Sequence, residues 1–261
     1  MKTKKKTKKR PKMKKSKKRT SKNKIKDPPF SKNINQGSDA TEGLIQYHYQ
    51  YYTNITDYIV YLCDKDKQLS NKICLLNDPI EATITFDQTD FKKGIVPKYI
   101  SQSKLIKFIK ECIATPKTYF IPILLETVKE KENHANIILI DIRKKHIELF
   151  EPHGNRGDES TLHNIEKTYL KKKRAVKTFF TSFLKDFQFI NVVDKLKKYR
   201  LQSRYDSNSG YCITWSLLYF HYRILNPRVS YKRIISYIDK KIKLHLLLKY
   251  ASHVEETLKT I

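Results

Sequence analysis

The chain has 261 residues, of which 39% are hydrophobic, and it carries a formal net charge of +28, a composition that allows one core of ordinary size or two small domains. No stretch reaches the roughly 18 consecutive apolar residues of a membrane span and the N-terminus lacks the apolar core of a secretory signal, so we expect a soluble intracellular protein without membrane contact. The four cysteines (Cys63, Cys74, Cys112 and Cys212) form no CxxC pair and no His/Cys pair at metal spacing, which argues against a metal centre and, in a reducing compartment, favours free thiols.

Residues 1–26 form a strongly basic tail. They hold 16 lysines and arginines and no acidic residue, which leaves +12 on the other 235 residues. Such a run repels itself and buries little apolar surface, so we expect it to be disordered unless a polyanion binds. One interpretation is contact with nucleic acid or nuclear import, and the other is a solvated solubility tail. The sequence thus predicts a disordered basic tail and linker over residues 1–43 and one folded domain over residues 44–261.

Hydrophobic periodicity predicts the elements of the folded part. Helices are expected over residues 44–63, 101–114, 160–186 (one or two helices), 212–225 and 230–249, and strands over residues 119–126, 135–142, 146–151 and 187–193. Helices, then strands, then a buried helix predict an α+β fold rather than a doubly wound sheet. The run NIILI at 136–140 has apolar residues at both even and odd positions, as in a central strand covered on both faces. Cys112 lies on the apolar face of its helix and is interpreted as a packing residue.

The strands over 135–142 and 146–151 should pair as an antiparallel hairpin because only a short polar segment joins them. If the turn centres between Ile142 and Arg143, facing residues have numbers that sum to 285. His134 then lies opposite Glu151 on one face, with Cβ atoms roughly 5 Å apart. A carboxylate in that place can fix the imidazole tautomer and leave the other ring nitrogen for a nucleophile. Asp141, at the far end of the hairpin, is interpreted as a turn residue.

Cys212 follows the segment SNSG at 207–210, which consists of cap and turn residues. This places Cys212 in the first turn of the buried helix, where the backbone N–H groups point toward it. A helix N-terminus and a nearby imidazolium lower a thiol pKa from its usual value of about 8.5, and the same N–H groups can bind an oxyanion. The alternative is that Cys212 is a small buried hydrophobic residue.

Residues from about 118 to 226 resemble the cysteine peptidases that include adenovirus protease and the SUMO- and ubiquitin-like-protein-specific proteases, especially those of large DNA viruses. The matching segments are TYFIPI, HANIILID, FEPHG and GYCITWS, the last followed by an aromatic-rich helix. The family has the order His, acid, Gln and Cys, permuted relative to papain, and commonly the His-to-acid interval of 17 seen here. The resemblance implies a small central mixed β-sheet flanked by helices, with Cys212 as nucleophile, His134 as base, Glu151 as orienting acid, and no metal or organic cofactor.

Two positions depart from the family pattern. The oxyanion-hole glutamine of the family usually lies six or seven residues before the cysteine, whereas the nearest upstream glutamine here is Gln202, ten residues before Cys212. Either the intervening loop is longer and Gln202 is the donor, which we prefer, or another group takes that role. The Trp that usually follows the histidine is replaced by Ala135, so substrate handling is expected to differ or activity to be weak.

The sequence therefore predicts a thiol endopeptidase that cleaves peptide or isopeptide bonds in a protein substrate. The resemblance makes maturation of viral polyproteins or virion proteins the first candidate, in the host cytoplasm, the nucleus or the virion. Two alternatives stay open. One is a peptidase-fold protein with weak or no activity that binds nucleic acid through residues 1–26, and the other is a protease that removes ubiquitin-like modifiers. The Lys/Arg run at 167–177 fits either a second polyanion surface or a solvated helix face.

Overall fold

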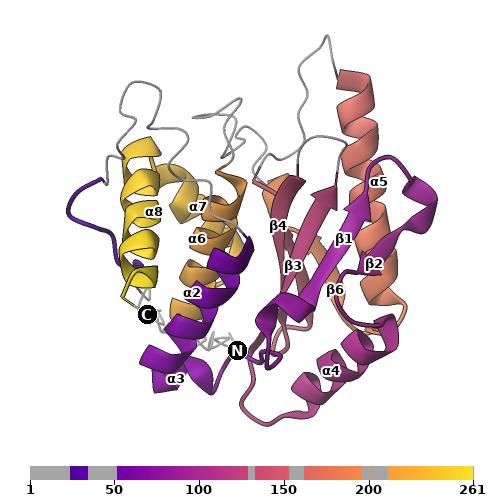
Figure 1. Ribbon diagram of the computed structural model, residues 1–261, viewed down its shortest axis with the longest axis horizontal. Helices are drawn as coiled ribbons and strands as arrows, with labels where there is room; N and C mark the ends of the chain where they lie inside the picture. Colours follow the sequence, from indigo (N-terminus) through magenta and orange to yellow (C-terminus); the bar gives the residue numbers. More distant parts are fainter. Residues whose placement is uncertain are drawn as a thin grey trace, which may run out of the picture.

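The computed structural model describes residues 24–34, 52–128, 133–152, 162–195, 201 and 211–260. In this part of the chain, six strands form one mixed sheet in the order β2-β1-β3-β4-β5-β6. Figure 1 shows α2, α6, α7 and α8 on one side of the sheet and α4 and α5 on the other. The predicted α+β class, with a mixed sheet flanked by helices, is confirmed.

The strands differ in length and in how they pair. Their bounds are β1 Thr83–Asp87, β2 Ile95–Pro97, β3 Phe120–Val128, β4 Asn133–Asp141, β5 His146–Phe150 and β6 Gln188–Asn191. The pairs β1/β3 and β5/β6 are parallel, and the other neighbours are antiparallel. The apolar run in β4 is buried on both faces, as predicted for a central strand. Both β1 and β2 were missed, because they are short and are separated by a polar turn.

The helices follow the predicted ranges only in part: residues 44–51 and 160–161 of two predicted helices lie outside the described residues, and the predicted helix over 160–186 ends at Thr181. Their bounds are α2 Tyr52–Lys65, α3 Lys67–Ser70, α4 Gln102–Ala114, α5 Leu162–Thr181, α6 Cys212–Leu225, α7 Tyr231–Lys241 and α8 Leu244–Leu258. The predicted single helix over 230–249 is wrong, since Ile242 and Lys243 adopt extended backbone angles and separate α7 from α8. Ile242 is fully buried there, so its side chain packs into the core while the chain changes direction.

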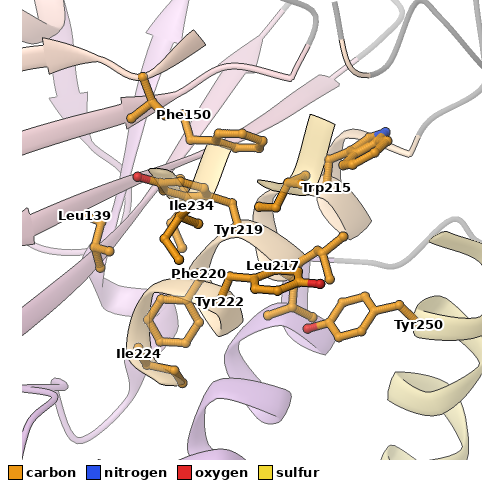
Figure 2. Packing of buried hydrophobic residues seen from close by; sticks show 14 of the residues in the cluster. Leu139, Phe150, Trp215, Leu217, Tyr219, Phe220, Tyr222, Ile224, Ile234 and Tyr250 are labelled. Carbon is orange, nitrogen blue, oxygen red and sulfur yellow. The ribbon is translucent and has the colours of Figure 1, made fainter. Parts of the chain in front are cut away.

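Two apolar layers hold the sheet between the helices. On one face, α6 packs with α2, α7 and α8 against Leu139 and Phe150, and the Phe150 ring stacks on Tyr219 at 4.5 Å between ring centroids (Figure 2). On the other face, α4 and α5 cover residues that include Ile138 and Ile140. Helix α6 is therefore buried almost all round, as its composition predicts. Among the helices that the structure describes, none has the length and apolarity needed to cross a membrane.

Cys74 and Cys112 form a disulfide, with their Cα atoms 5.8 Å apart. The prediction of four free thiols is therefore wrong for this pair, and only Cys63 and Cys212 are free thiols. Sequence spacing could not show the pairing, because 38 residues separate the two cysteines and the fold brings α4 against the segment that precedes β1. Cys112 is buried on the apolar face of α4, as predicted, but as one half of a cross-link.

Residues 24–34 lie within the segment predicted as tail and linker, yet they pack against the helices. Ile25 is buried in the core, and the backbone of Lys26 exchanges two hydrogen bonds with the Asn226 side chain at 2.7 and 2.8 Å. The carboxylate of Asp27 accepts a hydrogen bond from the Tyr222 hydroxyl at 3.0 Å and forms an ion pair with Lys241. We call residues 24–34 the N-terminal strap; residues 1–23 and 35–43 of the predicted tail lie outside the described residues.

Candidate active site

Cys212 is the first residue of α6, as the sequence predicts, and it is 6% exposed. Its position matters because the first N–H groups of a helix have no acceptor inside the helix and favour a nearby negative charge. Tyr211 precedes it as the N-cap residue without a side-chain capping bond. Segment 207–210 and Gln202, the predicted oxyanion-hole donor, lie outside the described residues, so their roles stay predictions.

His134 and Glu151 contact each other, although not through the predicted register. The ring nitrogen Nε2 of His134 lies 2.6 Å from Oε1 of Glu151. The observed pairs of β4 and β5, such as Ile137 with Phe150, sum to 287 rather than 285, so the predicted register is wrong by two. An error of two keeps both side chains on the same face, and the pair meets as diagonal neighbours.

The hairpin turn explains the register. Asp141 stays in β4 and pairs with His146, so the turn spans residues 142–145 and centres one residue later than predicted. The Asp141 carboxylate accepts a hydrogen bond from the backbone N–H of Lys144 at 3.2 Å and forms a buried ion pair with Arg223. The interpretation of Asp141 as a turn residue is thus wrong: it is a fully buried strand residue that anchors the turn.

His134 also forms a hydrogen bond with Cys212, so one imidazole joins the thiol to the carboxylate. Because Nε2 faces Glu151, Nδ1 is the nitrogen left for Cys212. Burial lowers the pKa of His134, but the charges of Glu151 and Cys212 and the hydrogen bonds to both outweigh burial and raise this pKa to about 9. This electrostatic pattern favours a protonated imidazole.

The thiol of Cys212 has the complementary shift. Burial raises its pKa, but the charge of His134, the hydrogen bond from His134 and a hydrogen bond from the Ala135 backbone N–H outweigh burial and lower the pKa below its ordinary value. A lowered thiol pKa beside a raised imidazole pKa is the signature of a thiolate–imidazolium pair. The other free cysteine contrasts with it, because burial raises the pKa of Cys63 to about 12.

Sequence reasoning missed two residues of this site, Asn136 and Lys172. Lys172 lies on α5, is 4% exposed, and forms an ion pair with Oε2 of Glu151. Its ammonium also donates a hydrogen bond to Oδ1 of Asn136 at 3.2 Å, and Nδ2 of Asn136 donates to the Phe150 carbonyl at 3.4 Å. Neither interpretation of the 167–177 run holds for Lys172, which is buried.

A signal for Lys172 was present in the sequence. Buried Tyr169, Val176 and Phe180 share its helix face, at helical spacings of three and four residues. A lysine within an apolar stripe predicts a buried acidic partner, since a buried cation needs one. Among the described residues, those of the site included, no group of three or more His, Cys, Asp or Glu side chains could hold a metal ion.

No protein-family model matches the chain, and no curated protein matches its sequence. The fold is similar to that of ASFV pS273R protease, with 17% identity and a TM-score of 0.41 over 78% of this chain and 67% of that chain; a second comparison with that protease covers only 43% of its length. ChlaDub1 from Chlamydia trachomatis matches with 9% identity and a TM-score of 0.38 over 81% of this chain and 89% of that chain. The C-terminal Ulp1 protease domain in complex with Smt3, the yeast ortholog of SUMO, matches with 12% identity and a TM-score of 0.34 over 79% of this chain and 76% of that chain.

Proposed function

We propose that this protein is a cysteine peptidase in which Cys212 is the nucleophile, His134 the general base and acid, and Glu151 the residue that orients the imidazole. The observation that carries the proposal is the connected series of contacts from Cys212 through His134 to Glu151, with the thiol at the first residue of a buried helix. Nucleophile, base and orienting group in mutual hydrogen-bond contact are the general signature of covalent catalysis.

Each group has a defined step in the proposed reaction. The Cys212 thiolate attacks the scissile carbonyl carbon, and the resulting oxyanion is stabilised by N–H groups at the start of α6. The His134 imidazolium then gives its proton to the departing amine, which leaves a thioester on Cys212. Neutral His134 next takes a proton from water, the hydroxide attacks the thioester, and the carboxylic acid product leaves as the thiolate–imidazolium pair forms again. Gln202 is the proposed second oxyanion donor.

For the substrate we propose a protein, with a viral polyprotein or virion protein as the first candidate and the host cytoplasm, nucleus or virion as the setting. The support is the resemblance of GYCITWS and FEPHG to the peptidases of large DNA viruses. Removal of ubiquitin-like modifiers would use the same three residues and differ only in the surface that binds the modifier. Contact of residues 1–26 with nucleic acid stays a prediction, since 16 lysines and arginines favour a polyanion.

The proposal is tested by labelling with a peptide that ends in glycine and carries a thiol-directed electrophile. Wild type, Cys212→Ala, His134→Ala and Cys63→Ala should be compared, with the modified residue located by peptide mass spectrometry. We expect labelling of wild type and Cys63→Ala at Cys212, no labelling of Cys212→Ala, and a rate at least about a hundredfold lower for His134→Ala, because that variant lacks the base.

Cys63→Ala is the matched control, because Cys63 is the other free thiol and its pKa is raised rather than lowered. Labelling that survives in His134→Ala at the wild-type rate would remove the proposed pair. If wild type is not labelled at all, the alternative of a peptidase-fold protein without activity is favoured instead.

A further inference from the structure

The buried ammonium of Lys172 lies behind the proposed triad rather than in it. It reaches Oε2 of Glu151, while Oε1 of the same carboxylate contacts His134. The carboxylate is therefore held at both oxygens, by the imidazole on one side and by the ammonium on the other. Since the Lys172 side chain is 5% exposed and that of Glu151 is 2% exposed, this ion pair is shielded from water.

Asn136 fixes the ammonium to the strand that carries His134. Its Oδ1 accepts a hydrogen bond from Lys172 at 3.2 Å, while its Nδ2 lies 3.2 Å from Nε2 of His134 and donates to the Phe150 carbonyl. Asn136 is fully buried on β4, two residues after His134 and on the same face. Helix α5 and strand β4 thus each supply a group that contacts the Glu151 carboxylate, which lies one residue after the end of β5.

The charges alternate along this series. Lys172 is positive, Glu151 negative, the His134 imidazolium positive and the Cys212 thiolate negative, so the reactive pair forms in a site with no net charge. Without the ammonium, the same buried site would carry one uncompensated negative charge, which burial makes costly.

We propose that Lys172 is a positioning residue for the catalytic triad, which holds Glu151 ionised and turned toward His134 by binding the second oxygen of its carboxylate. This inference rests on the proposed function and adds a fourth residue to it, from α5. Lys172 touches neither the reacting atoms nor the thiol, so it acts only through Glu151 and the field it creates.

The direction of its effect follows from charge alone. A positive charge near a titratable group favours the deprotonated form of that group. Removing Lys172 should therefore raise two pKa values: that of Cys212, which sets the pH at which alkylation begins, and that of His134, which NMR follows directly. Removing Glu151 should lower the pKa of His134 instead, so the two residues are distinguishable by the sign of the shift.

The test compares Lys172→Met with wild type across pH 4–11, by the rate of Cys212 alkylation with iodoacetamide and by NMR titration of the His134 ring. We expect the alkylation rate at pH 7 to fall about tenfold, as when groups that orient a site residue are removed. We expect the His134 titration to move up by roughly half a unit to one unit. Lys172→Arg keeps the charge and should return the titration toward the wild-type position.

Lys173→Met is the matched control. Lys173 is the next residue on α5, but its ammonium pairs with Asp194 and its side chain is 31% exposed, so its loss should leave the His134 titration unchanged. The double variant Glu151→Gln/Lys172→Met removes both buried charges, which protects folding if the single variant is unstable. In that background, with each variant measured at the pH of its own highest rate so that pKa shifts from the field of Lys172 are removed, the loss of Lys172 should change the alkylation rate by no more than about twofold relative to Glu151→Gln alone.

Three results would overturn the inference. The first is a His134 titration that does not move in Lys172→Met, and the second is a shift of equal size in Lys173→Met. The third is a decrease in the logarithm of the alkylation rate in the double variant that equals the sum of the decreases in Glu151→Gln and Lys172→Met. These measurements need no cleavage of substrate, so failure of this inference can be distinguished from failure of the proposed function. If wild type labels at Cys212 but the titration is insensitive to Lys172, the peptidase proposal stands and the positioning role does not.

Discussion

At the scale of single residues, the feature that would govern the proposed reactivity is the sharing of one proton between Cys212 and His134. The imidazole gains this proton because two negative groups face it, and the thiol loses it because an imidazolium and a backbone N–H face it. Helix α6 contributes the electrostatic environment of its N-terminus, and the β4/β5 hairpin contributes the partner. Cys212 by itself has the burial of a core residue, so its reactivity comes from its neighbours.

The pH dependence of the site follows from the raised pKa of His134. In the proposed reaction the departing amine takes its proton from the His134 imidazolium, so the rate of cleavage of a glycine-ended peptide amide should hold through neutral pH and fall as pH rises past about 9. In Glu151→Gln the largest raising influence is removed, so the alkaline limb should move to lower pH and the rate at pH 7 should fall.

The control is Glu111→Gln, which removes an exposed carboxylate on α4 and should leave the profile in place. Rates of cleavage of the glycine-ended peptide amide, measured against pH for the three proteins, decide the matter. An alkaline limb of Glu151→Gln at or above that of wild type would contradict the assigned contact between Glu151 and His134.

At the scale of elements, α6 joins the sheet through polar contacts as well as apolar packing. The Arg223 guanidinium, fully buried on α6, donates to Glu148 of β5 at 2.9 Å and to Asp141 of β4 at 2.9 Å. A hydrogen bond from Tyr219 to Glu148 at 2.6 Å completes the network. Because these residues fix α6 against both strands of the hairpin, they also fix the position of Cys212 relative to His134.

Replacing Arg223 by Met should be strongly destabilising, because it removes the buried cation between Glu148 and Asp141 and leaves only Lys144 paired with Asp141. The expected loss of unfolding free energy is about 3–5 kcal/mol. Chemical denaturation of Arg223→Met and of the control Arg228→Met, which removes an exposed arginine, measures the difference. Equal midpoints for the two variants would contradict a stabilising role for the network.

The same network predicts a sensitivity to acid. Burial raises the pKa of Glu148, but Arg223 and the hydrogen bonds to the carboxylate outweigh burial and lower the pKa from 4.5 to about 2. A lowered folded-state pKa stabilises the fold above the unfolded value, and this contribution is lost as pH falls from about 4.5 toward 2. The unfolding free energy of wild type should therefore fall over this range, and that of Arg223→Met should fall less.

At the scale of the whole molecule, the sequence predicted the fold class, the central strand and the start of α6, because each depends on local periodicity and capping. It predicted the proximity of His134 and Glu151 although the predicted strand register was wrong by two residues. Side chains alternate between the two faces of a strand, so an error of two residues still places both side chains on the same face. It did not predict Lys172, the disulfide or the packing of the N-terminal strap. Each of these depends on contacts between segments far apart in the chain.

The N-terminal strap, residues 24–34, was predicted to be part of the basic tail but packs on the helices. Residues 24–34 bury Ile25, pair Lys26 with Asn226 and join Asp27 to α6 and α7, so they belong to the folded body. Deletion of residues 1–23 should leave the unfolding midpoint unchanged, whereas deletion of residues 1–34 should lower the unfolding free energy by roughly 2–4 kcal/mol, the scale of one buried aliphatic side chain and its accompanying hydrogen bonds.

Denaturant unfolding of the two truncations measures this difference, with Asp27→Asn in the full chain as an intermediate case that keeps the apolar contact but removes the ion pair with Lys241. The shorter deletion also tests the electrostatic prediction separately, because it removes 14 of the 16 lysines and arginines and should flatten the salt dependence of any affinity for DNA. Equal stability of the two truncations would show that the strap contributes no net stability. An unchanged salt slope after the shorter deletion would place polyanion binding on the folded body.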